Sequence, residues 1–134
     1  MTPNTTNKPK KRPSVKKHWD QQTGYLILKS LCDEFNLTLV KEFRFCPIED
    51  KLQKRRYRFD YCIVELKMGI EFDGGIWSNK PSHSSSTGIT RDIEKGNYAQ
   101  LCGYSWYRFT YQQSKTYLYD TIKQAITNKL NTNQ

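Results

Sequence analysis

Two short runs, RRYRFDYCIV at residues 55–64 and MGIEFDGG at residues 68–75, decide the fold that we expect for this chain. Apolar and aromatic residues dominate both runs, and a short polar break separates them, which predicts two neighbouring strands of a β-hairpin. A symmetric turn at the centre of the break would place Asp60 directly opposite Glu71.

Three acids in these runs are expected to lie close together. Side chains alternate along a strand, so Glu71 and Asp73 should share a face, with Asp60 across from Glu71. Like charges directly opposite each other in a sheet repel by some tenths of a kcal/mol to about 1 kcal/mol. A fold that builds such a cluster needs a compensating cation, and a divalent metal is the first candidate.

The length and composition favour one folded domain. The chain has 134 residues, of which 36% are hydrophobic and 13% aromatic. This is enough for a real core. No apolar run approaches the 18 residues of a membrane span and the N-terminus lacks a signal-peptide pattern, so we expect no membrane association and a cytoplasmic location.

The cysteines are scattered beside apolar or aromatic residues, without a CxxC pair. We expect buried free thiols, although a zinc or disulfide site remains an alternative. These residues are Cys32, Cys46, Cys62 and Cys102.

The positive charge is concentrated at the N-terminus. The net charge is +9, and residues 1–17 hold six of the 22 Lys and Arg residues but none of the 13 Asp and Glu residues. We expect residues 1–17 to be a disordered tail that binds nucleic acid, and residues 18–134 to be a single domain. A tail that only increases solubility remains an alternative. Its cations are Lys8, Lys10, Lys11, Arg12, Lys16 and Lys17.

A second group of cations leads directly to Asp60 and alternates with aromatic side chains. This pattern indicates contact with nucleic-acid phosphates. We expect the contacts to involve Lys54, Arg55, Arg56 and Arg58.

Hydrophobic periodicity predicts an α/β fold in which helices flank a mixed four-stranded sheet. A strand, a crossover helix and a second strand imply a parallel pair, and the hairpin supplies antiparallel pairs. The order is α-β-β-β-α-β followed by a C-terminal helix. Besides the hairpin, we expect a helix at 19–35, a strand at 38–45, a loop at 74–88, a helix at 91–101, a strand at 104–111 and a helix at 116–130.

Two local details follow from the same patterns. Strict alternation in the strand at 38–45 predicts that Leu39, Lys41, Phe43 and Phe45 share one side, opposite Val40, Glu42 and Arg44. The helix at 91–101 is expected to begin after a Thr90 cap, with Asp92 and Glu94 in its first turn.

Five motifs occur in a fixed order across residues 38–111. They are Phe59-Asp60, Ile70-Glu71-Phe72-Asp73-Gly74-Gly75, the loop with His83, Asp92-Ile93-Glu94-Lys95, and Gly103-Tyr104-Ser105-Trp106-Tyr107-Arg108-Phe109-Thr110. The set resembles the PD-(D/E)XK nuclease superfamily, with its restriction-endonuclease-like core, and within it the small very-short-patch-repair-like and phage endonuclease branch. The third catalytic position of that superfamily is commonly Lys, and Asp73 stands there in this chain.

The resemblance implies a Mg²⁺ site, in which Mn²⁺ is expected to substitute. Asp60 and Glu71 would be direct ligands and the main-chain carbonyl of Phe72 a third. Hard carboxylate oxygens suit Mg²⁺ on chemical grounds as well. Asp73 would bind a second ion or hold a metal-bound water, and Glu42 is a possible additional acid.

Three further residues receive candidate roles. Lys95 is expected to replace the missing strand lysine and to stabilise the attacking water or the phosphate, unless it is an ordinary surface lysine. His83 would act as a base or contact a phosphate. Trp77 would stack on a nucleobase or pack its loop.

The sequence as a whole predicts a metal-dependent DNA endonuclease, a hydrolase of phosphodiester bonds. If a phage encodes it, the location would be the host-cell cytoplasm. Alternatives are a nuclease-fold protein that binds DNA without cutting it, and a small basic interaction protein. A two-fold substrate would favour a homodimer.

Overall fold

The computed structural model describes residues 17–45, 57–73 and 86–132, and it confirms the predicted α/β class with a mixed four-stranded sheet. The described elements are α1 (Gln21–Glu34), β1 (Leu39–Arg44), β2 (Arg58–Ile63), a short 3₁₀ turn (Val64–Leu66), β3 (Met68–Phe72), α2 (Ser86–Leu101), β4 (Ser105–Phe109) and α3 (Lys115–Thr132). The predicted tail, apart from Lys17, lies outside the described residues.

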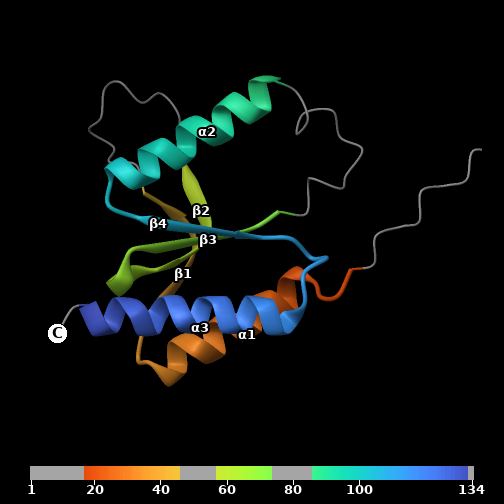
Figure 1. Ribbon diagram of the computed structural model, residues 1–134, viewed down its shortest axis with the longest axis vertical. Coiled ribbons are helices and arrows are strands. Elements are labelled where there is room, and N and C mark those ends of the chain that lie inside the picture. Colours follow the sequence, from red (N-terminus) through yellow and green to blue (C-terminus); the bar gives the residue numbers. More distant parts are fainter. Residues whose placement is uncertain (1–16, 46–56, 74–85, 133–134) are drawn as a thin grey trace, which may run out of the picture.

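The strands lie in the order β1-β2-β3-β4. β1, β2 and β3 form an antiparallel meander, while β3 and β4 are parallel, as expected for strands joined through the crossover helix α2. Figure 1 shows α2 on one face of the sheet and both α1 and α3 on the other. None of the helices in the described ranges is both long enough and apolar enough to cross a membrane.

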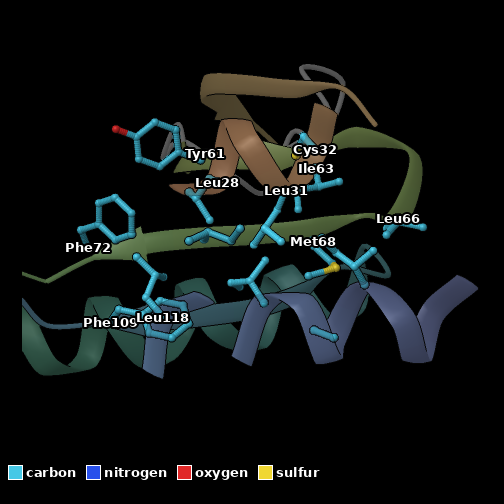
Figure 2. Close-up of a cluster of buried hydrophobic side chains, with 14 of the residues drawn as sticks. Leu28, Leu31, Cys32, Tyr61, Ile63, Leu66, Met68, Phe72, Phe109 and Leu118 are labelled. Atoms are coloured by element: carbon cyan, nitrogen blue, oxygen red, sulfur yellow. The ribbon is translucent and has the colours of Figure 1, made fainter. Parts of the chain in front are cut away.

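The larger core fills the space between the sheet and the pair α1 and α3 (Figure 2). Leu28, Leu31 and Cys32 recur at helical spacing on α1 and are fully buried there. From α3 come Leu118, Ile122, Ala125 and Ile126. Complete burial of an aliphatic side chain contributes about 1.5–3 kcal/mol relative to exposure, so this layer supplies most of the hydrophobic stabilisation.

The smaller core, on the α2 side, is mainly aromatic. Its buried members are Phe45, Tyr57, Phe59, Cys62 and Ala99. Phe59 lies across β3, where a Cβ on Gly69 would come within 2.4 Å of its ring. Glycine at position 69 therefore makes room for this aromatic layer.

The prediction that Leu39, Lys41, Phe43 and Phe45 share one side of the first strand is wrong. Leu39 packs with the larger core, and Phe43 and Phe45 belong to the smaller one. The alternation breaks at Glu42, whose φ is +50°. A residue in the left-handed region turns the strand, so the side chains that follow point to the other face.

The predicted start of the second helix is also wrong. α2 begins at Ser86, so Thr90 lies inside it and neither Asp92 nor Glu94 is in its first turn. The Ser-Thr-Gly sequence before Thr90 indicated a loop, but one glycine costs a helix only about 1 kcal/mol relative to alanine. The helix therefore extends through Gly88.

The free-thiol prediction is confirmed for Cys32, Cys62 and Cys102, of which the first two are buried. Burial raises the pKa of Cys32 to about 11 and that of Cys62 to about 12, so both remain protonated at neutral pH. Cys46 lies outside the described residues.

Candidate active site

Asp60 and Glu71 lie across from each other at one end of the hairpin. The β2–β3 register pairs Ile63 with Met68 and Tyr61 with Ile70. Continued by one residue, it places Asp60 opposite Glu71, as the sequence predicted. Asp60 Oδ2 accepts a hydrogen bond from the main-chain N–H of Phe72 at 3.0 Å. This bond ties the carboxylate of Asp60 to the adjacent strand.

The two carboxylates differ in exposure, because Asp60 is an exposed residue whereas Glu71 is largely covered. The Glu71 side chain is only 13% exposed. Desolvation is the largest cause of the raised pKa of Glu71, and its proximity to Asp60 and Asp73 adds to it. Desolvation likewise raises the pKa of Asp60, against the opposing effects of the Phe72 N–H and the Lys95 charge. The pair therefore attracts cations.

Lys95 provides such a cation from α2. Its ammonium pairs with Glu71 Oε1, and its side chain is 16% exposed. The same ammonium lies 5.1 Å from the centre of the Trp106 ring. The structure thus brings Lys95 to the acidic pair, as predicted, and holds it between a carboxylate and an indole.

Arg108 is the site residue that the sequence analysis missed. It belongs to β4, where the parallel register pairs it with Glu71. Its guanidinium donates to Asp73 Oδ2 through Nε at 2.8 Å and approaches Asp92 Oδ2 through Nη2 at 3.4 Å. The available signal was its place in the β4 motif, but its partners depend on which strand lies beside β4.

Trp106 lies under both cations of the site. The guanidinium of Arg108 is 4.9 Å from the indole centroid, close to the Lys95 value. Gly96 of α2 approaches the same ring, where an added Cβ would be 3.1 Å from Trp106. Cations over an indole face are attracted by its quadrupole. Trp106 therefore keeps Lys95 and Arg108 side by side over the end of the sheet.

Asp73 and Glu42 are placed differently from the central pair. Asp73 is held by the fork of Arg108 and its side chain is 25% exposed. The β1–β2 register puts Glu42 across from Asp60, but the Glu42 side chain is 73% exposed and lies 3.7 Å from Arg58. Glu42 is thus a neighbour of Asp60 whose own carboxylate is open to solvent.

Two of the predicted nucleic-acid contacts are described. The Arg58 side chain is 57% exposed near Asp60, and the Lys17 ammonium lies 4.7 Å from the centre of the Tyr111 ring. The other candidates are outside the described residues: Lys8, Lys10, Lys11, Arg12, Lys16, Lys54, Arg55, Arg56, Trp77 and His83.

Comparisons of the chain with family models, with curated proteins and with solved structures found no match.

Proposed function

We propose that this chain is a metal-dependent DNA endonuclease that hydrolyses phosphodiester bonds with an activated water. The observation that carries the proposal is the convergence of Asp60, Glu71 and Lys95, which come from β2, β3 and α2. Two neighbouring carboxylates and one ammonium at a sheet end provide a cation site beside a group that can neutralise a phosphate.

The oxygen donors at this site fit Mg²⁺. Within residues 17–45, 57–73 and 86–132, no group of three or more His, Cys, Asp or Glu side chains is placed to hold a metal ion. Mg²⁺ is usually bound through one or two carboxylates together with water and substrate phosphates, so a carboxylate pair is sufficient. Asp60, Glu71 and the main-chain carbonyl of Phe72 would hold the ion, and Mn²⁺ should substitute. When bound, the ion lowers the pKa of water and offsets charge on the phosphate.

Lys95 acts on the substrate in this proposal. Lys95 now offsets the charge of Glu71, and with a metal ion on that carboxylate its ammonium would be available to a phosphate oxygen. In the nuclease superfamily that this chain resembles, a lysine on the strand usually stabilises the charge that develops on the phosphate. Asp73 occupies that position here, so Lys95 would take over this role. Trp106 keeps the ammonium at the site while its partner changes.

Arg108 orients Asp73 and adds a second positive charge. The bond from Nε and the ion pair from Nη2 both reach Asp73 Oδ2, which fixes this carboxylate relative to β4. Asp73 as a ligand of a second ion stays a prediction. Its carboxylate has further lone pairs that could hold the attacking water.

A second candidate function is DNA binding without cleavage. The observation that favours it is that both Glu71 and Asp73 already have cationic partners, Lys95 and Arg108. Such pairs also occur as purely structural ion pairs. The net charge of +9 supports a nucleic-acid partner in either case.

A plasmid nicking assay separates the two candidates. Supercoiled DNA is incubated with the full chain in Mg²⁺, in Mn²⁺ and in EDTA. The endonuclease proposal expects relaxed or linear product with either metal and none in EDTA. Asp60→Asn should remove the activity, whereas Asp33→Asn, at an exposed acid of α1, should keep it. DNA binding without product in either metal would favour the second candidate.

A further inference from the structure

A pocket of about 510 Å³ opens beside Asp60, between the first turns of α1 and the strands β1 and β2. Its size falls in the range of small-molecule sites, about 300–1,000 Å³. Asp60 is the carboxylate that the pocket shares with the proposed metal site. Among the other lining residues are Gln21, Gln22, Tyr25, Lys41 and Glu42.

The pocket has an ordered wall of aromatic and amide groups. Tyr25 stacks on Tyr61 with ring centres 5.9 Å apart, and the ammonium of Lys41 lies 4.0 Å from the centre of the Tyr25 ring. Gln21 Nε2 donates to the hydroxyl of Tyr61 at 3.3 Å. Gln22, in contrast, makes no side-chain hydrogen bond to the residues that the structure describes. Its amide is available to a ligand.

The charge of the lining selects the ligand. Asp20, Glu42 and Asp60 contribute three carboxylates, and the cations beside them are Lys41 in the lining and Arg58, which lies 3.7 Å from Glu42. A phosphate would be repelled, whereas a neutral group with N–H donors would be accepted. The edges of nucleobases carry such donors, and carboxylate and glutamine side chains are the groups that pair with the amino groups of cytosine and adenine.

The positive φ of Glu42 bears on the same pocket. Glu42 lies at the break in β1, after which the side chains turn toward the α2 face. The turn directs Phe43 to the α2 face, so β1 contributes Lys41 and Glu42 to the pocket but not Phe43. A strained non-glycine residue at this position coincides with the pocket wall.

We propose that this pocket takes a single unpaired nucleobase of the strand being cut, next to the scissile phosphate. The inference rests on the proposed function, because Asp60 would contact both the metal ion and the edge of the pocket. A base that is paired in a duplex must first leave the stack, at a cost of a few kcal/mol. The substrate class is therefore DNA with an unpaired base at the cut, such as a bulge, a mismatch or a flap.

The test uses binding rather than cleavage. The full chain is titrated, with Ca²⁺ in place of Mg²⁺, into a duplex with a bulged 2-aminopurine and into the fully paired duplex. Because unstacking costs a few kcal/mol and each 1.4 kcal/mol is tenfold in affinity, the bulged duplex should bind about tenfold tighter or more. The fluorescence of the bulged 2-aminopurine should change on binding.

Two variants locate the effect. Gln22→Ala removes one hydrogen bond, worth about 0.5–1.5 kcal/mol, and should lower the preference for the bulge about two- to tenfold. Gln22→Trp fills the pocket and should abolish the preference while leaving binding of the paired duplex unchanged. Gln100→Ala, at an exposed glutamine of α2 on the other face, is the matched control and should behave like the unaltered chain.

The outcomes separate this inference from the proposed function. Equal binding of the two duplexes, binding of neither, or a preference that Gln22→Trp leaves intact overturns the pocket assignment, even if the chain cuts plasmid DNA. A preference that Gln22→Trp abolishes supports the pocket, even if no DNA is cut, in which case only the endonuclease proposal fails.

Discussion

The two faces of the sheet differ in what they bury. The face covered by α1 and α3 is largely aliphatic, and within the described residues its buried core contains no charged side chain. The α2 face combines an aromatic layer with the ion pairs of Lys95 and Arg108 at one end of the sheet. The first arrangement stabilises the fold, because apolar burial is favourable without directional partners. The second places paired charges where water is partly excluded, at a desolvation cost that can exceed their Coulombic attraction.

The largest effect is expected at the carboxylate pair. Asp60→Asn and Glu71→Gln should each abolish cleavage in Mg²⁺, because each removes a metal ligand. Desolvation raises the pKa of both acids, so Asp60→Asn should not lower the thermal stability of the metal-free chain, whereas Glu71→Gln also removes the partner of the Lys95 ammonium and should lower it. Thermal melts with and without Mg²⁺ check this, since a metal that binds only the folded chain raises its melting temperature. Cleavage at the unaltered rate by either variant would show that the α2 face is only structural.

A smaller loss is expected when the ammonium is removed. Lys95→Ala should reduce the single-turnover rate about 10²- to 10³-fold with nearly normal DNA binding, as for other lost transition-state contacts. Lys95→Arg should recover part of the rate, because a planar guanidinium does not reproduce the position of an ammonium. Lys29→Ala, at an exposed ion pair on α1, is the control. Retention of more than about a third of the rate would make Lys95 an ordinary helix residue, given the expected size of the effect.

Arg108→Lys tests the residue that only the structure revealed. Lysine keeps the charge but loses the fork that reaches Asp73 through Nε and Nη2. A hydrogen bond to a charged group is worth about 1.5–3 kcal/mol, so its loss should lower the rate about 10- to 150-fold. DNA affinity should hardly change. A large loss of affinity with an unchanged single-turnover rate would instead assign Arg108 to DNA binding.

The smallest functional effect is expected on the opposite face. Ile122→Val removes one buried methylene from α3 and should lower the free energy of unfolding by about 0.5–1.5 kcal/mol. The rate of cleavage below the unfolding transition should stay the same. Urea denaturation measures the first quantity and single-turnover cleavage the second. A fall in the cleavage rate that matches the loss of stability would contradict the assignment of stability to one face of the sheet and of activity to the other.

Most of the element order was predictable because it depends on local patterns. The spacing of Leu28, Leu31 and Cys32 is helical, and the β2–β3 hairpin follows from the short connection between two apolar runs. The beginning of α2 was not predictable from the residues around Gly88, since the weak helix propensities of Ser, Thr and Gly cost too little to end a helix there. The break in β1 at Glu42 was not predictable either, because the pattern of apolar and polar residues does not reveal the backbone angle φ.

The sequence by itself determined that Asp60 and Glu71 lie opposite each other on neighbouring strands. A short turn and a side-chain period of two set this pairing locally, without help from the rest of the chain. Only the tertiary structure decided which cations complete the site. Lys95 and Arg108 reach Glu71 and Asp73 across 24 and 35 residues of sequence. Such contacts depend on the parallel register of β3 with β4 and on how α2 packs over the sheet, which no local pattern specifies.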